Sequence, residues 1–203
     1  IPLFIAGLGM ANNRMITLLC EGPSENAYIQ ELNRYLRENE CKLVLIPSKN
    51  PIGTGFYSTV YPRYRKEREK TPIKMILDDD IYVRNGNNQE KSNTAKYKDS
   101  PIKDDFLFNT HNFEDFLMLH YDDETLNQWI ATCAEYNHEQ VPLHSDEYIP
   151  LLQKMFPNYK KGELLFTPID KDKLDNLFRH NEDKGIFIKS DFAAFLKKLL
   201  NDS

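Results

Sequence analysis

Residues 15–22, MITLLCEG, decide the fold. Their apolar run has the length of a buried strand, and it ends at the pair Glu21-Gly22. A turn follows, in which Ser24 is the expected N-cap of a helix. Apolar side chains then recur at helical spacing, at Ala27, Tyr28, Leu32, Tyr35 and Leu36. The order strand, turn, helix is typical of the first unit of an α/β sheet.

The rest of the chain divides into strand-length apolar runs and longer helical patterns. Further strands are expected at 42–47, 73–77 and 105–109. Because strands and helices alternate over this part of the chain, we predict a mostly parallel sheet flanked by helices. This α/β core is expected to span residues 14–122, with a helical region at 123–203 packed on it. Helices are predicted at 57–70, 111–121, 124–137, 146–156, 170–180 and 190–200.

Residues 1–13 precede the first predicted strand. Residues 1–9, IPLFIAGLG, are apolar but too short for a membrane span, which needs about 20 residues. They also lack the basic start of a secretory signal. Met10 is typical of a natural start, so residues 1–9 are expected to be either vector-derived or an N-terminal edge strand.

The composition is that of an ordinary globular protein. Hydrophobic residues make up 40% and charged residues 28% of the chain, which allows a sizeable core. The three cysteines form no Cys-x-x-Cys pair, which favours a reducing, cytoplasmic setting over a disulfide framework or a zinc knuckle. The formal net charge of -5 argues against binding of nucleic acid by charge alone. It does not exclude a nuclease, because an acidic metal site also lowers the net charge.

Acidic side chains follow two of the predicted strands. Glu21 follows the first strand, and Asp78, Asp79 and Asp80 follow the strand at 73–77. Since the carboxyl ends of parallel strands meet at one edge of a sheet, Glu21 and Asp78 are expected to lie together. In an extended segment Asp78 and Asp80 point the same way, and Asp79 points away. Such oxygen ligands suit Mg²⁺ or Mn²⁺, which can activate water at a phosphodiester, so we predict a metal site here.

Four segments resemble the Toprim domain, in particular its RloB-like branch, which is similar to the OLD-type nucleases. LLCEGPSENAYIQEL at 18–32 is similar to the opening Cys-Glu-Gly-x-Ser/Thr-Glu-x-x-Tyr of that branch, and MILDDD at 75–80 matches its Asp-x-Asp motif. NFEDFLMLHY at 112–121 is similar to the helix Phe-Glu-x-Trp-Leu-Leu-Leu-His-Phe/Tyr, with Phe116 in place of Trp. NYKKG at 158–162 resembles a later Tyr-x-Lys segment.

The resemblance implies a Toprim-like fold and a magnesium-dependent nuclease that cleaves DNA or RNA, tRNA included. It implies that Glu21 is a general acid/base or a metal ligand and that Glu25 is a second-metal ligand. It implies that Asp78 and Asp80 are magnesium ligands, and that Glu114 is an additional acidic catalytic group. RloB-like proteins are encoded in prokaryotic defence neighbourhoods, often beside an ATPase, which implies an anti-phage role and an ATPase partner by association.

Ordinary structural roles compete with several of these assignments. Glu25 is equally well explained as an exposed carboxylate in the first turn of a helix. Glu114 lies within an apolar helix, where a buried Arg or Lys partner would serve as well as a catalytic role. His111 and His120 flank the same helix, and a hydrogen-bonded structural histidine is commoner than one that transfers protons.

Positive charge gathers in two segments of this acidic chain. Lys160 and Lys161 are suited to a phosphate, but only one of two adjacent residues is expected to face the site, and Lys160 is the catalytic candidate. The segment 61–74 interleaves basic and aromatic residues that can track a nucleic-acid backbone. Its alternative is a solvated helix face balanced by Glu67 and Glu69. The members of this basic segment are Tyr61, Arg63, Tyr64, Arg65, Lys66, Arg68, Lys70 and Lys74.

Other chemistries lack support in the sequence. HNEDKGIFIKSD at 180–191 imitates a calcium-binding EF-hand loop, but His180 and Lys184 stand where acidic ligands belong. Ser190 is expected instead to cap the last helix. The sequence contains no P-loop, dinucleotide-binding glycine motif or serine-hydrolase elbow.

Two rival functions and one question of regulation stay open. A catalytically silent Toprim-like subunit would dock an ATPase or nucleic-acid partner, and exposed Trp129 and Phe156 would favour it. A primase- or topoisomerase-related strand-joining activity is the second rival, and the lack of a plausible tyrosine-bearing second domain argues against a topoisomerase. The polar excursion at 84–104 and the tail after 163 have no counterpart in the family pattern. Because that excursion is expected to be flexible, the isolated chain is expected to be a poor nuclease until a partner protein, a homodimer neighbour or the substrate orders it.

Overall fold

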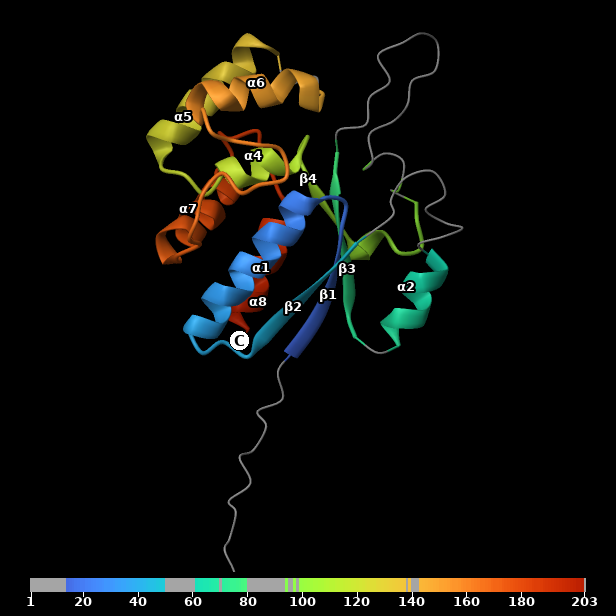
Figure 1. Ribbon diagram of the computed structural model, residues 1–203. Coiled ribbons are helices and arrows are strands. Elements are labelled where there is room, and N and C mark those ends of the chain that lie inside the picture. Colours follow the sequence, from blue (N-terminus) through green and yellow to red (C-terminus); the bar gives the residue numbers. More distant parts are fainter. Residues whose placement is uncertain are drawn as a thin grey trace, which may run out of the picture.

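The computed structural model describes residues 14–49, 61–69, 71–79, 94, 97, 99–137, 139 and 143–202 (Figure 1). The expectations for residues 1–13, for Asp80 and for most of the excursion at 84–104 fall outside these residues. Within the described part of the chain, no helix has both the length and the apolar character needed to cross a membrane.

Four parallel strands form one sheet in the order β2-β1-β3-β4. They are β1 (Arg14–Cys20), β2 (Leu43–Lys49), β3 (Ile73–Asp78) and β4 (Phe106–Asn109). Each strand coincides with an apolar run of the sequence, so the prediction of a parallel α/β sheet flanked by helices is confirmed. The arrangement is consistent with a Toprim-like fold.

The order in which strands join the sheet reverses at β1, because β2 lies on one side of it and β3 on the other. Helix α1 (Pro23–Glu38) connects β1 to β2, whereas the connection through α2 (Tyr61–Arg68) returns past β1 to β3. The two helices cover opposite faces of the sheet (Figure 1). Such a reversal leaves the carboxyl ends of β1 and β3 side by side at a topological switch point, where open α/β sheets bind ligands.

Helix α1 begins earlier than the sequence predicted. Gly22 is its N-cap, and Pro23 stands at the start of the helix, where the missing N–H of proline would have had no partner. The prediction of Ser24 as N-cap is therefore wrong, and Ser24 lies buried in the first turn. Because the helix starts immediately after β1, Glu25 in the same turn stays close to the end of that strand.

The two faces of the sheet pack against different hydrophobic clusters. On β3, Met75 and Leu77 join a small cluster with Tyr64 of α2, and Ile76 between them joins the main core on the other face. This alternation is that of a pleated strand. The main core receives buried side chains from α1, α4 (Phe113–Met118), α5 (Asp123–Glu135), α6 (Ser145–Met155), α7 (Lys171–Glu182) and α8 (Asp191–Asn201).

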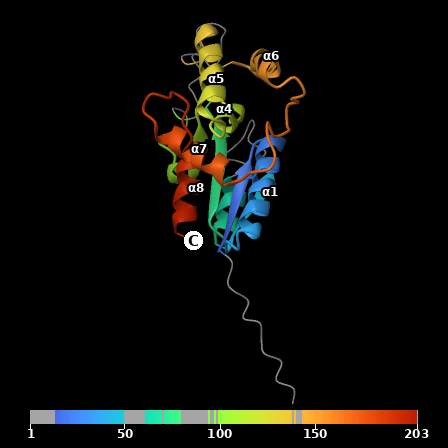
Figure 2. The ribbon, with the colours of Figure 1, turned by 90° about the vertical axis from the view of Figure 1, so that its left-hand side faces the viewer.

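The tail after residue 163, which the sequence left unassigned, completes this core. Phe192 and Leu196 of α8 are fully buried, and α8 packs beside β4. Ser190 accepts a hydrogen bond from the backbone N–H of Ala193, so its predicted role as the cap of the last helix is confirmed. Helices α4, α5 and α6 lie beyond the carboxyl edge of the sheet (Figures 1 and 2), and the short helix η2 (Lys103–Asp105) leads into β4.

Side chains from neighbouring helices bind the backbone at both outer strands. On β2, the Asn33 amide donates to the carbonyl of Leu45 at 2.6 Å and accepts from the N–H of the same residue at 2.9 Å. On β4, the carboxylate of Asp191 accepts from the N–H of Phe108 at 3.1 Å. Asn33 therefore imitates the backbone of a further strand, and it satisfies polar groups that burial would otherwise leave unpaired.

We expect Asn33→Ala to lower the free energy of unfolding by about 1–3 kcal/mol, because both backbone groups of the buried Leu45 lose their partner. Urea unfolding followed by circular dichroism measures the change. Asn26→Ala is the matched control, since the Asn26 side chain only accepts from Gln30 on the exposed surface of the same helix. Equal destabilisation by the two substitutions would contradict a special role for Asn33.

Candidate metal centre

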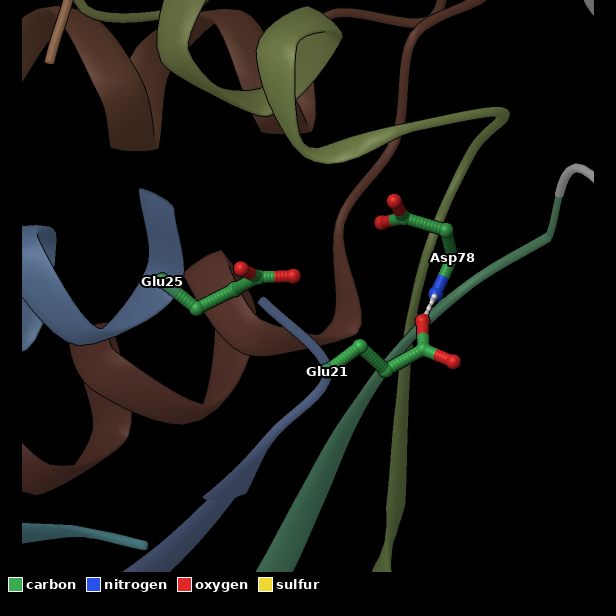
Figure 3. A group of neighbouring side chains, drawn as sticks. All are labelled: Glu21, Glu25 and Asp78. Atoms are coloured by element: carbon green, nitrogen blue, oxygen red, sulfur yellow. Dashed lines mark hydrogen bonds between the residues drawn. The ribbon is translucent and has the colours of Figure 1, made fainter. Parts of the chain in front are cut away.

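Three carboxylates converge at the switch point of the sheet. Glu21 directly follows β1, Asp78 ends β3, and Glu25 lies in the first turn of α1. Each offers an oxygen, and these oxygens all lie within 4.8 Å of one another. The backbone N–H of Asp78 donates to Oε2 of Glu21 at 3.0 Å and so connects the ends of the two strands (Figure 3).

Strand pleating selects which acidic side chain of β3 enters the group. Asp78 shares a face of the sheet with Ile76, on the side covered by α1. Asp79 is directed elsewhere, because its Oδ1 accepts from the backbone N–H of Thr94 at 2.8 Å. The expected pairing of Glu21 with Asp78 is thus present in the structure, whereas the predicted ligand Asp80 lies outside the described residues.

Glu25 is the buried member of the group, with 4% of its surface exposed. Burial raises its pKa to about 7, hydrogen bonds from the backbone N–H groups of Glu25 and Gly22 oppose the rise, and the charge of Glu114 adds to it. A Cβ on Gly22 would meet Oε2 of Glu25 at 3.0 Å, so glycine leaves room for this carboxylate. Because Glu25 is buried, the alternative interpretation of it as an exposed carboxylate in the first turn of a helix does not fit the structure.

The donor set suits a hard divalent cation. All three candidate ligands are oxygens, and the crowding of their negative charges is what a bound cation would relieve. A bound cation would favour the ionised form of Glu25 and would therefore oppose the rise in its pKa that burial causes. On these grounds Mg²⁺ or Mn²⁺ fits the residues that are present.

A cavity of about 270 Å³ opens above the carboxylates. Its other walls come from the second half of the chain: Glu114 of α4, His144, Ser145 and Tyr148 at the start of α6, and Lys161. No sequence pattern points to His144, Ser145 or Tyr148, because their proximity to the strand ends arises from tertiary packing alone.

Glu114 is buried and bound by two tyrosines. Its Oε2 accepts from the hydroxyl of Tyr148 at 3.0 Å, and its Oε1 accepts from the hydroxyl of Tyr159 at 2.9 Å. Tyrosine hydroxyls therefore take the place of the Arg or Lys partner that the sequence analysis considered. Glu114 lies near enough to Glu25 to raise its pKa, but it is not a member of the three-carboxylate group.

The adjacent lysines have different positions. Lys161 lines the cavity, and its charge lowers the pKa of Glu25, whereas the exposed Lys160 is not among the lining residues. The turn that orients them depends on Gly162, which has a φ of +93°. A Cβ at this position would also meet Cγ of Pro23 at 3.0 Å. The turn thus packs directly against the start of α1, and the geometry favours Lys161 over the predicted Lys160 as the lysine of the site.

We expect Gly162→Ala to destabilise the protein by about 1–2 kcal/mol, because the left-handed backbone and the contact with Pro23 both exclude a methyl group. Thermal unfolding monitored by circular dichroism measures the loss. Gly185→Ala is the control, since its Cβ would meet only Oδ1 of the exposed Asp183 at 3.2 Å. A Gly162→Ala protein as stable as the wild type would contradict the close approach.

His120 is a buried structural histidine whose two ring nitrogens are both hydrogen-bonded. Its Nδ1 lies 3.2 Å from the carbonyls of Phe116 and Leu117, and its Nε2 lies 2.8 Å from the hydroxyl of Tyr28. Nδ1–H donates to the carbonyls and Nε2 accepts from the tyrosine, which is the neutral form of the ring. Burial lowers the pKa of His120 to about 3. His111 is also buried, beside Phe187, and neither histidine lines the cavity.

His120 makes stability depend on pH. Its pKa is about 3 in the folded protein and about 6.5 in the unfolded chain, so between these values the unfolded state binds the extra proton. Stability is therefore complete above pH 6.5 and falls on acidification through this window, by about 1.4 kcal/mol per pH unit for one proton. We expect His120→Gln to remove this contribution, which urea unfolding at pH 7.0, 6.0 and 5.0 can measure. Parallel pH profiles of wild type and variant would refute it.

The basic segment is only partly a free surface. Tyr64 is buried and donates to Asp105, and Lys74 forms an ion pair with the same carboxylate at 3.0 Å. These two residues are not placed to stack on bases or to track a phosphate backbone. Arg63, Arg65 and Lys66 are exposed on α2, and the side chains of the other members lie outside the described residues.

Trp129 and the segment that imitates an EF-hand both have structural roles. Trp129 is fully buried, with its Nε1 donating to Oδ1 of Asp115 at 2.7 Å, so it does not form the exposed docking surface that a silent subunit would need. In the segment that imitates an EF-hand, the ammonium group of Lys189 donates to the carbonyls of Asn181 and Asp183. A protein cation therefore binds this loop.

No protein-family model and no curated protein matches the sequence. Among solved structures, the C-terminal region of the Burkholderia pseudomallei OLD protein is similar to this chain, with a TM-score of 0.37 and 13% sequence identity. The similarity covers 81% of this chain and 97% of that chain.

Proposed function

We propose that this protein is a metal-dependent nuclease that hydrolyses phosphodiester bonds at the carboxyl edge of its sheet. The observation that carries the proposal is the convergence of Glu21, Glu25 and Asp78, from three separate points of the chain, within 4.8 Å beneath a cavity. Burying a carboxylate among other carboxylates is unfavourable, and such arrangements concentrate at functional sites.

The residues divide into a cation-binding group and a phosphate-facing group. Glu21, Glu25 and Asp78 would hold Mg²⁺ or Mn²⁺, and Asp80 joins them in the family pattern. When bound, the cation supplies a Lewis acid that polarises the phosphodiester and activates water. Lys161 lines the same cavity and supplies a positive charge, which can neutralise charge that develops on the phosphate.

The RloB-like resemblance supports a narrower form of this proposal. Nucleic acid, as DNA or RNA including tRNA, would be the substrate, an ATPase would be the partner, and anti-phage defence would be the setting. The acidic net charge and the modest exposed basic surface of α2 favour low activity of the isolated chain, because the substrate approaches against repulsion.

We expect Glu21→Gln and Asp78→Asn each to weaken Mn²⁺ binding by more than about 100-fold, since even changes outside the ligand shell of a metal commonly cost about 10–100-fold. Cleavage of single- and double-stranded DNA, total RNA and tRNA should fall in parallel. Isothermal titration with Mn²⁺ and gel assays with Mg²⁺ and Mn²⁺ measure the two effects.

Asp79→Asn is the matched control for these substitutions. It changes the neighbouring residue in the same way, and asparagine can still accept from the N–H of Thr94. Its Mn²⁺ affinity should stay within about threefold of the wild type. Equal Mn²⁺ binding by wild type and Asp78→Asn would move the metal site elsewhere. Binding without cleavage of any of the four substrates would favour the silent subunit instead.

A further inference from the structure

The wall of the cavity that faces the carboxylates is anchored to one buried group. This wall, called the roof below, comprises residues 144–148 at the start of α6 and the turn at 158–162. Tyr148 belongs to the first part and Tyr159 to the second, and both hydroxyls donate to the carboxylate of Glu114. The two parts of the roof therefore share one acceptor, which belongs to α4.

A further hydrogen bond joins the two parts of the roof directly. The side chain of Gln153 in α6 donates to the backbone carbonyl of Tyr159 at 3.0 Å. Tyr159 is thus held at its hydroxyl by Glu114 and at its backbone by α6. Two residues further along the chain stands Lys161, which lines the cavity.

We propose that Glu114 is a positioning residue, which acts through Tyr148 and Tyr159 to hold Lys161 opposite the carboxylate group. The proposal rests on the proposed function, because Lys161 needs a defined place only if a phosphate is bound there. A positioning role differs from the catalytic role that the sequence suggested for Glu114. The two carboxylate oxygens, which would bind a metal or carry a proton in a catalytic role, both accept hydrogen bonds from tyrosine hydroxyls.

Burial and hydrogen-bonding capacity support this assignment. Glu114 is 4% exposed, and each of its oxygens has a donor within 3.0 Å. Burial raises the pKa of Tyr148 and Tyr159, and the nearby charge of Glu114 raises both further, so the hydroxyls keep the protons that they donate. A metal ion at Glu114 would have to use the lone pairs that the two tyrosine hydroxyls leave free, whereas these hydroxyls already fix both oxygens in place.

The test removes the two hydroxyl groups and leaves their rings in place. The variants are Tyr148→Phe, Tyr159→Phe and the double substitution, with Tyr121→Phe as the matched control. Tyr121 also loses one hydroxyl bond, to the carbonyl of Leu165 at 2.9 Å, but it lies outside the roof. Trypsin cleavage after Lys160 and Lys161, followed by mass spectrometry, reports opening of the turn without reference to activity.

We expect the double variant to be cleaved by trypsin in the turn at least about 10-fold faster than the wild type, because opening no longer breaks the bonds to Glu114. Its kcat should fall by about 10–100-fold, the effect of displacing a charged group by about 1 Å, and its Mn²⁺ affinity should remain within about twofold. Tyr121→Phe should match the wild type in all three measurements.

Glu114→Gln separates positioning from metal binding. Glutamine can accept from one tyrosine and donate to the hydroxyl oxygen of the other, so a positioning role predicts kcat within about fivefold of the wild type. Mn²⁺ affinity should fall by less than about fivefold, because only a neighbouring charge is lost. Loss of Mn²⁺ binding in Glu114→Gln as large as in Glu21→Gln would make Glu114 a ligand and overturn the proposal.

The failure of the proposed function would be distinguishable from the failure of this inference. A wild type that binds Mn²⁺ but cleaves no nucleic acid would refute the proposed nuclease activity. The trypsin measurement would still show whether Glu114 keeps the turn at 158–162 closed. Whether or not the wild type is a nuclease, trypsin cleavage of the double variant at the wild-type rate would show that Glu114 does not hold the roof.

Discussion

Repulsion among the carboxylates at the switch point is the constraint on which the rest of the structure depends. Two unit charges 4.8 Å apart repel by about 3 kcal/mol at an effective dielectric constant of about 20. Glu21, Glu25 and Asp78 are nevertheless held together by the direct passage from β1 into α1 and by the parallel pairing of β1 with β3. The pKa of Glu25 is raised, first by its burial and then by the charge of Glu114.

The C-terminal helices give this edge of the sheet its chemical environment. Without them the carboxylates would face water on an open sheet edge. Helix α6 and the turn at 158–162 enclose the group from the other side, and α7 and α8 complete the core that supports α4. The segment that matched no family pattern is therefore structural, and its contribution to the site is indirect.

The sequence predicted the sheet and the common edge of Glu21 and Asp78 because both depend on local patterns. Apolar runs mark the strands, and parallel strands end at a common edge, which places Glu21 and Asp78 on that edge. They meet because β1 and β3 are neighbours in the sheet, an order that the apolar runs do not specify. Glu25 stayed ambiguous, since Glu114 and Lys161, whose charges act on it, lie far away in the chain. The choice between Lys160 and Lys161 depended on the left-handed backbone of Gly162, which residue types alone do not specify.

Tyr148 shows the limit of such arguments most clearly. It bonds to Glu114 across 34 residues, and no periodicity or motif relates the two positions. The Ser24 cap failed for a different reason. Serine is a good cap, but Gly22 had already taken that place, since Pro23 can begin a helix directly after the strand.

The hydrogen bonds at the outer strands also bear on self-association. Exposed strand edges recruit strands from other chains, which is a common origin of aggregation. Asn33 of α1 and Asp191 of α8 already bind the backbone groups of Leu45 on β2 and Phe108 on β4, so an incoming strand would have to displace a side chain at either edge. Strand addition at these two positions would therefore cost the hydrogen bonds of a side chain, which should slow growth into fibres by continuous strand addition.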